Sequence, residues 1–266
     1  LIHNKYIKNI DLLINNEKIN INVNKYPEFK NEIIMSTIVY NEDKYIIQWI
    51  EFHKNIGVTR FIIYDNTDKE KTNSDLPNVL DKYIKKGIVL LIKWSYPYRL
   101  PISGISGQTT QQNHSIYAFK NSKFIGLFDI DEYINMKNNT NINTLFDSLI
   151  KNKKINTKNI GSFRILNKNF TNPYNLSEEN YDFLSIYTCD KLTIKGNEKN
   201  FVIPKNVNTF SVHTITSGKK TFNINSKYIY FNHYVFLNKS NRGKNKYKFK
   251  DDSILKHCNF IKFLDN

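Results

Sequence analysis

Between residues 33 and 128, short apolar runs alternate with amphipathic stretches. The apolar runs have the length and composition of strands buried on both faces, and they lie at 33–40, 61–64, 88–94 and 124–128. The stretches between them repeat apolar residues every three or four positions, which predicts helices at 45–56, 76–86 and 108–121. Gly57 and Gly87 follow the first two helices, as helix-ending glycines commonly do. The alternation indicates an α/β fold with a doubly wound, mostly parallel sheet flanked by helices.

The pattern changes on both sides of this region. Residues 1–30 are polar, with an alternation near 19–23 that predicts an N-terminal extension forming an edge hairpin or a strand that leads into the core. Beyond residue 135, short apolar runs predict mixed or antiparallel strands at 163–166, 183–187, 201–203, 209–212 and 228–230. A strongly basic segment, 238–250, precedes a predicted terminal helix at 254–263. We therefore expect an extension (1–30), an α/β half (31–135) and a mixed α+β half of the same domain (136–266).

Composition supports a folded chain with a real core. Of the 266 residues, 40% are hydrophobic and 14% aromatic, which a disordered chain would not carry. Cys189 and Cys258 cannot build a disulfide framework, and no Cys/His cluster has zinc spacing. No apolar run approaches the roughly 20 residues that span a bilayer. As the chain stands we expect a cytoplasmic protein without signal or membrane segment, although Leu1 in place of Met suggests a processed chain or part of a longer one.

The net charge is +15, from 39 Lys and Arg against 24 Asp and Glu. A basic surface attracts phosphate groups, but an AT-rich coding sequence would also enrich Lys, Asn and Ile. We favour this compositional explanation. Dedicated nucleic-acid sites rely on Arg, which is scarce here, so we expect no nucleic-acid partner.

Polar side chains follow three of the predicted strands, at 41–42, 65–66 and 129–132. Ligands in such sheets bind at the carboxyl ends of strands, so these groups should converge on one crevice. Asp129 and Asp131 stand one residue apart after a buried strand, where both carboxylates can reach Mn²⁺ or Mg²⁺. A divalent cation there would neutralise a diphosphate leaving group.

Two histidines in the second half could complete a metal site. His233 ends a predicted strand and His213 ends another apolar alternation. Each could instead be a packed histidine, and Trp49 and His53, one helical turn apart, are expected to pack a helix against the sheet. Glu42 either complements a helix dipole or belongs to the crevice. The basic stretch with Arg242 and Lys244 is either a phosphate-binding flap or a solvated loop.

An ordered set of motifs is far more specific than the paired aspartates alone. It comprises YNE at 40–42, QWIEFH at 48–53, GV at 57–58, FIIYDN at 61–66, QN at 112–113 and FDIDEY at 128–133. By these motifs the chain resembles glycosyltransferase family 92 and related family-2-like transferases. Later stretches match more loosely, namely KNFVIP at 199–204, VH at 212–213 and HY at 233–234.

The resemblance implies a GT-A fold, a UDP-sugar donor, Mn²⁺ or Mg²⁺, and a glycan or glycoprotein acceptor. It implies that Asp129 and Asp131 form the D-x-D motif, with Asp131 the more direct metal ligand, and that Asp65 contacts the nucleoside. The nucleotide-sugar site would comprise Tyr40, Asn41, Glu42, Asp65, Gln112, Asn113, Asp129, Arg242 and Lys244. Inverting transfer needs a general base. Where the family resemblance would place a Glu-Arg-Tyr-like element, this chain has LSIYT at 184–188. The remaining candidates for the general base are Glu178, Glu179 and Asp182.

Two other functions use similar features. A nucleotidyltransferase also needs paired carboxylates and a metal ion, but it would normally carry a glycine-rich phosphate loop after the first strand, and residues 37–41 contain no Gly. A non-catalytic basic module would bind polyanions with strong salt dependence.

Overall fold

The computed structural model describes residues 9–22, 25–67, 75–100, 106–138, 140–170, 188–189, 195–234 and 249–258. The α/β half has the predicted parallel strands, adjacent in the order β6, β3, β4, β5. Their bounds are β3 (Ile33–Val39), β4 (Arg60–Asp65), β5 (Val89–Lys93) and β6 (Phe124–Leu127). The connecting helices are α1 (Asp43–Asn55), α2 (Leu76–Lys85) and α3 (Ser106–Ala118). The predicted alternation is confirmed, with boundaries shifted by a few residues.

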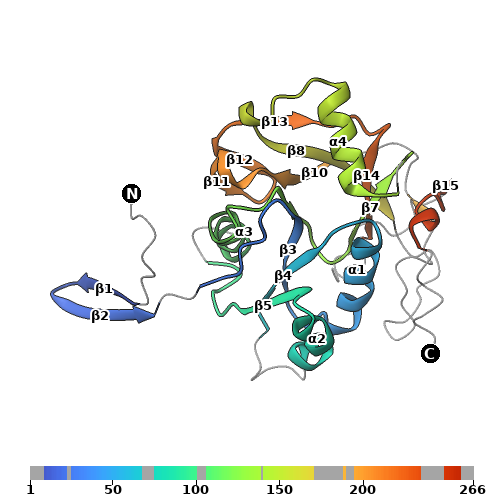
Figure 1. Ribbon diagram of the computed structural model, residues 1–266. Coiled ribbons are helices and arrows are strands. Elements are labelled where there is room, and N and C mark those ends of the chain that lie inside the picture. Colours follow the sequence, from blue (N-terminus) through green and yellow to red (C-terminus); the bar gives the residue numbers. More distant parts are fainter. Residues whose placement is uncertain are drawn as a thin grey trace.

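The helices cover opposite faces of this sheet (Figure 1). Apolar residues of α1 and α2 pack in the same core cluster as Met35 and Phe61. On the other face, Ile116 of α3 and Phe119, which follows the helix, pack in the cluster of Ile34. Gly57 ends α1 with a φ of 101°, in the region open to glycine but strained for other residues. Within the described residues, no helix is long and apolar enough to cross a membrane.

The second half continues the same sheet rather than forming a separate one. Strand β10 (Lys195–Val202) pairs antiparallel with β6 on one side and with β8 (Ile160–Phe170) on the other. Strand β14 (Ile229–Tyr234) lies parallel to β8 and antiparallel to β7 (Glu132–Met136). The remaining members are β9 (Thr188–Cys189), β13 (Lys220–Asn223) and β15 (Phe249–Lys250). Among the described residues the sheet has eleven strands, which confirms the mixed architecture expected after residue 135.

Two small β-structures lie outside the main sheet. Strands β11 (Val207–Ser211) and β12 (Thr214–Gly218) form a hairpin that packs against α3. Strands β1 (Asn9–Ile14) and β2 (Glu17–Asn22) form the N-terminal hairpin. That hairpin was expected at an edge of the main sheet, but it is a separate two-stranded sheet (Figure 1). Alternation predicts strands but does not identify the strand that each one pairs with.

A fourth helix, α4 (Ile142–Asn152), was not predicted from the sequence. The side chain of Asn141 accepts hydrogen bonds from the backbone N–H groups of Asn143 and Thr144, which caps the helix start. Ile142, Leu145, Phe146 and Leu149 have helical spacing, but the polar, Asn-rich surroundings obscured it. Of the predicted terminal helix, the described part is only a 3-10 turn, Leu255–His257, and 259–263 lie outside the described residues. The strand expected at 183–187 also lies outside them.

Four phenylalanines join the two halves in one core. Phe124 of β6 contacts Phe146 of α4, with ring centroids 4.8 Å apart, and Phe163 of β8, with centroids 5.5 Å apart. Phe146 also lies 5.0 Å from Phe201 of β10. All four rings are buried. The α/β half and the mixed half therefore share a hydrophobic core, as expected for halves of one domain.

Two histidines buried in this core should make the protein sensitive to acid. Burial lowers the pKa of His53 to about 3, and burial, with repulsion from Lys256, lowers the pKa of His257 to about 4. Both side chains are almost fully buried. The unfolded chain protonates its histidines near pH 6.5, so below that pH it binds protons that the folded chain does not. The stability contributed by neutral histidines is therefore complete above pH 6.5 and decreases as the pH falls toward 4.

We expect His257→Gln to reduce this dependence by about 1.4 kcal/mol per pH unit between pH 6 and 5. Urea unfolding of the wild type and the variant at several pH values measures the difference between the two slopes. Parallel profiles for the two proteins would show that His257 does not titrate on unfolding.

Candidate functional site

The polar groups that follow β3, β4 and β6 gather at the carboxyl ends of these strands. Asp65 ends β4, and its Oδ1 accepts a hydrogen bond from the backbone N–H of Thr67 at 3.0 Å. The backbone N–H of Asn41, after β3, donates to Thr67 Oγ1 at 3.3 Å, which joins the two loops. Glu42 lies close enough to Asp131 for the charge of Asp131 to raise the pKa of Glu42. These strand ends therefore lie side by side, and the crevice expected between them remains a prediction.

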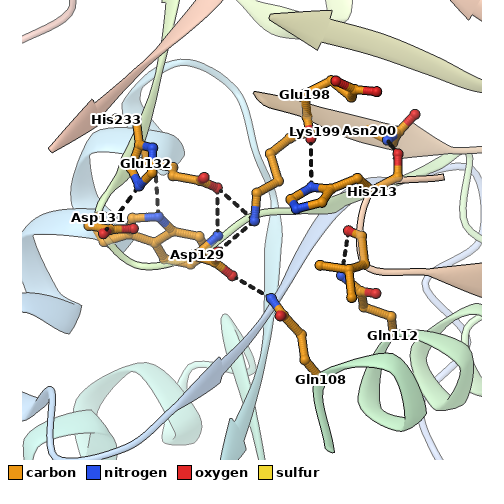
Figure 2. Close-up of polar contacts among 12 residues, drawn as sticks. Gln108, Gln112, Asp129, Asp131, Glu132, Glu198, Lys199, Asn200, His213 and His233 are labelled. Atoms are coloured by element: carbon orange, nitrogen blue, oxygen red, sulfur yellow. Dashed lines mark hydrogen bonds and ion pairs between the residues drawn. The ribbon is translucent and has the colours of Figure 1, made fainter. Parts of the chain in front are cut away.

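His233 approaches Asp131 because of strand register. In the β7–β14 pair His233 stands opposite Glu132, and the backbone N–H of Tyr234 donates to the carbonyl of Asp131 at 2.9 Å. His233 Nε2 lies 3.5 Å from Asp131 Oδ2 (Figure 2). Residues a hundred positions apart in sequence thus form one ion pair at the strand ends.

Asp131, Glu132 and His233 could hold a divalent cation. One potential ligand atom from each lies within 4.8 Å of the others. Asp131 and Glu132 are buried, and two carboxylates with an imidazole form a donor set that suits Mn²⁺. The Nδ1 atom of His233 is buried and has no hydrogen-bond partner in the described structure. The residues present therefore fit a metal site, and they include Asp131 and His233, which the sequence analysis named as candidate ligands. That these residues bind a metal ion remains a prediction.

Asp129 is held differently from Asp131. Its Oδ2 lies 2.6 Å from Nζ of Lys199, and its Oδ1 accepts a hydrogen bond from Nε2 of Gln108 at 2.9 Å. The same lysine lies 3.2 Å from Oε2 of Glu132, which also accepts the backbone N–H of Asp129 at 2.9 Å. Figure 2 shows Lys199 between the two carboxylates. The expected metal role of Asp129 remains untested, but both of its carboxylate oxygens already have partners from the chain.

Burial and neighbouring charge set the protonation of the acids. Burial raises the pKa of Glu42 to about 8, and the nearby Asp131 and Asp129 add to the rise. Burial also raises the pKa of Glu132 to about 7, against the opposing effect of Lys199. For Asp129 burial acts in the same direction, but Lys199 outweighs it and holds the pKa below the usual value. The site therefore holds carboxyl groups of distinct proton affinity within a small volume.

The cations of the site remain charged at neutral pH. Burial would lower the pKa of Lys199, but Asp129 and Glu132 raise it above its ordinary value. Burial would likewise lower the pKa of His233, but Asp131 raises it to about 9. At neutral pH, in the absence of metal, His233 is therefore an imidazolium paired with Asp131.

His213, the second histidine candidate, does not join the Asp131 cluster. Its Nδ1 lies 2.9 Å from the carbonyl oxygen of Glu198, and Asn200 Nδ2 donates to its carbonyl at 2.8 Å. In Figure 2 it lies on the other side of Lys199 from His233. Burial, with repulsion from Lys199, lowers the pKa of His213. The geometry favours His233 over His213 as a partner of Asp131.

The two amides predicted to bind the donor have different partners. Asn113 exchanges hydrogen bonds with the backbone of Phe210, its Nδ2 donating at 2.7 Å and its Oδ1 accepting at 2.9 Å, so it anchors β11 to α3. Gln112 donates from Nε2 to the carbonyl of Val212 at 3.2 Å, while its buried Oε1 has no partner in the described part of the chain. Of the two amide oxygens, that of Gln112 is buried and lacks a partner within the described residues, whereas that of Asn113 is occupied.

The other predicted donor contacts divide into two groups. Tyr40 and Asn41 are exposed where β3 ends, and Tyr40 retains 50% of its surface. Some candidates lie outside the described residues, namely the bases Glu178, Glu179 and Asp182 and the flap residues Arg242 and Lys244. These roles stay predictions.

Sequence reasoning missed the residues that hold the site together. Lys199 lay within a loosely matching motif but carried no assigned role. Gln108, the first residue of the helix predicted at 108–121, also carried none, although it is buried. Trp49 does pack α1 as expected, and its Nε1 also donates to the carbonyl of Glu132 at 3.1 Å. His53 packs beside it, with ring centroids 4.8 Å apart. For Glu132, the only signal in the sequence for its presence in the site was its position directly after Asp131.

The model of glycosyltransferase family 92 matches residues 32–261. Among curated proteins, a family 92 protein of Ricinus communis is 20% identical over 216 residues, covering 79% of this chain and 36% of that protein. One of Oryza sativa subsp. japonica is 24% identical over 212 residues, covering 77% of this chain and 33% of that protein. The chain thus spans about a third of the length of these relatives.

Similarity to solved structures is weaker. S. aureus TarS in complex with UDP aligns with a TM-score of 0.37 and 13% identity, covering 59% of this chain and 40% of that one. A mannosyltransferase of S. cerevisiae aligns with a TM-score of 0.32 and 12% identity, covering 54% of this chain and 41% of that one.

Proposed function

The chain belongs to glycosyltransferase family 92, and on that basis we propose that it transfers a sugar from a UDP-sugar donor to a hydroxyl group of a glycan or glycoprotein. The observation that carries the proposal is the cluster at the strand ends. Asp131 lies 3.5 Å from His233, with Glu132 beside them, at the point of the sheet where α/β proteins bind nucleotides.

We propose that Asp131, His233 and Glu132 hold Mn²⁺ or Mg²⁺. When bound, the cation would supply positive charge to the diphosphate leaving group. For His233 to serve as a ligand, its Nε2 must lose the proton that it shares with Asp131, since only a neutral imidazole nitrogen can coordinate metal. Burial of Asp131 limits competition from water at the same carboxylate.

The strand ends around this cluster would bind the nucleotide. Asp65 is buried at the end of β4, with one carboxylate oxygen turned to its own loop, and we assign it to the nucleoside, as the family resemblance implies. The exposed ring of Tyr40 offers a stacking surface where β3 ends. The unpartnered Oε1 of Gln112 offers an acceptor for a hydroxyl or amide group of the donor. Transfer with inversion follows from the family resemblance.

A donor screen tests this function. We expect hydrolysis of a UDP-sugar, but not of GDP- or CMP-sugars, in the presence of Mn²⁺. The metal would recognise the diphosphate, which CMP-sugars lack, and the nucleoside contact assigned to Asp65 would select uridine over guanosine. We expect UDP with Mn²⁺ to raise the melting temperature, since a ligand that binds only the folded chain stabilises it.

The outcomes of the screen separate the parts of the proposal. Full turnover in excess chelator would exclude a catalytic metal ion but leave sugar transfer intact. Stabilisation by another nucleotide and not by UDP would show that the uridine assignment is wrong. If no nucleotide-sugar is hydrolysed or bound under any of these conditions, the proposed function fails.

A further inference from the structure

We propose that Lys199 is a positioning residue of this site, whose ammonium group fixes the Asp129 and Glu132 carboxylates and weakens the attraction of the site for a divalent cation. The inference rests on the proposed function, because it concerns the same cluster of acids. It assigns a role to a side chain that belongs neither to the paired aspartates nor to the histidines.

Strand pairing brings Lys199 to the acids. In the antiparallel β10–β6 pair, Asn200 stands opposite Leu127, so the residue before Asn200 lies beside the chain as it leaves β6 toward Asp129. Nζ of Lys199 then reaches Oδ2 of Asp129 at 2.6 Å and Oε2 of Glu132 at 3.2 Å. A central strand fixes the backbone of this lysine, so its position does not depend on a loop.

The ammonium group of Lys199 is buried against the two carboxylates. Only 3% of Lys199 is exposed, and its charge is balanced by the two carboxylates that it bridges. A buried ammonium group without such partners would be costly, and so would the buried Glu132 carboxylate without the ammonium group, whereas the Asp129 side chain is partly exposed. The three groups therefore stabilise each other's charged forms.

A second side chain restrains Asp129 through its other carboxylate oxygen. Gln108 of α3 donates to the Oδ1 atom of Asp129, while Lys199 of β10 occupies Oδ2 (Figure 2). Asp131 instead faces His233. The two aspartates of the motif thus have separate partners, and Lys199 keeps Asp129 in place beside the cation site.

The charge of Lys199 also opposes a cation. Around Asp131 the described structure places further acids, namely Asp129, Glu132 and Glu42, and Lys199 cancels part of their negative potential. A divalent ion bound beside Asp131 would be repelled by this ammonium group, and in a buried site that repulsion is only partly screened. Removing the charge should therefore tighten metal binding, whereas a purely structural lysine would leave metal affinity unchanged or weakened when it is removed.

The test measures Mn²⁺ binding to the purified protein without nucleotide, by the loss of the free-ion electron paramagnetic resonance signal. We expect Lys199→Met to bind Mn²⁺ at least about tenfold more tightly than the wild type, and Lys199→Arg to bind it with wild-type affinity. The matched control is Lys85→Met, which removes a lysine from an exposed ion pair with Asp81 on α2 and should change nothing.

A charge-compensated variant covers the case in which Lys199→Met does not fold. Asp129→Asn should weaken Mn²⁺ binding about tenfold, because Lys199 then stands unopposed, and the double variant Lys199→Met/Asp129→Asn should restore wild-type affinity. Circular dichroism and the melting temperature show which variants are folded.

Three results would overturn the inference: Lys199→Met that folds and binds Mn²⁺ no more tightly than the wild type, a double variant that binds as weakly as Asp129→Asn alone, or absence of Mn²⁺ binding in every variant. Failure of the proposed function is read separately, from the donor screen. The two tests are independent, because the Mn²⁺ titration uses no nucleotide and the donor screen uses no variant of Lys199.

Discussion

Asp131→Asn is expected to lower sugar transfer from a UDP-sugar at least about a thousandfold, the largest loss that we expect from any single change. The substitution preserves the shape of the side chain and removes its negative charge. Asp131 is the carboxylate that pairs with His233, and only 8% of its side chain is exposed, so water cannot replace it easily. Without it, His233 loses the counter-ion that raises its pKa, and the proposed metal site loses its central ligand.

Release of UDP, followed over a range of Mn²⁺ concentrations, measures the loss, and a metal-binding defect should be only partly overcome at high Mn²⁺. Asp147→Asn is the matched control, because Asp147 is an exposed aspartate of α4 paired with Lys123. We expect it to retain wild-type activity. An Asp131→Asn enzyme with more than a tenth of wild-type activity would show that Asp131 is not central to transfer.

Phe163→Ala is expected to have the largest effect on stability, lowering the free energy of unfolding by about 3–5 kcal/mol. Its ring is fully buried and contacts Phe124, Phe146 and Phe222, with centroids 5.5, 5.1 and 5.9 Å away. Truncation leaves a cavity between the two halves of the molecule, where rigid strands prevent the neighbouring rings from closing it. For a chain of this size the melting temperature should fall by roughly 6–20 °C.

Thermal and urea unfolding measure this change. Phe249→Ala is the matched control, because Phe249 is exposed, and it should change the free energy of unfolding by less than about 1 kcal/mol. We expect one cooperative transition in both the wild type and the variant, since one core unites residues 31–135 with 136–266. Two separate transitions, with only one of them shifted by Phe163→Ala, would contradict the division into halves of a single domain.

The parallel half was predictable because each of its signals is local. Strand β4 (Arg60–Asp65) is buried on both faces, so its residues 61–64 form a continuous apolar run, and Gly57 marks the end of the preceding helix. In the second half, by contrast, the helix α4 was missed. Its apolar residues have helical spacing, but its start depends on capping by Asn141, and Asn is too common in this chain to stand out.

Part of the candidate site could also be predicted from the sequence. Asp129 and Asp131 could be placed because they directly follow a buried strand, and strand ends are where these sheets bind ligands. His233 could be proposed because it ends an apolar strand. The short distance between His233 and Asp131 could not be predicted. It follows from the register in which β14 pairs with β7, and the pattern of apolar residues does not determine that register.

The order of residues along the chain thus determined the α/β class, the family and the strand end that bears the acids, since each of these depends on residues close together in sequence. Tertiary structure alone decided which charges meet. Lys199 and Gln108 approach Asp129 from a strand and a helix that are distant from it and from each other in sequence, and their effect depends on distances of 2.6 and 2.9 Å. The electrostatic interaction energy varies steeply with distance and burial, so the protonation and metal preference of these acids follow from packing rather than from the motif.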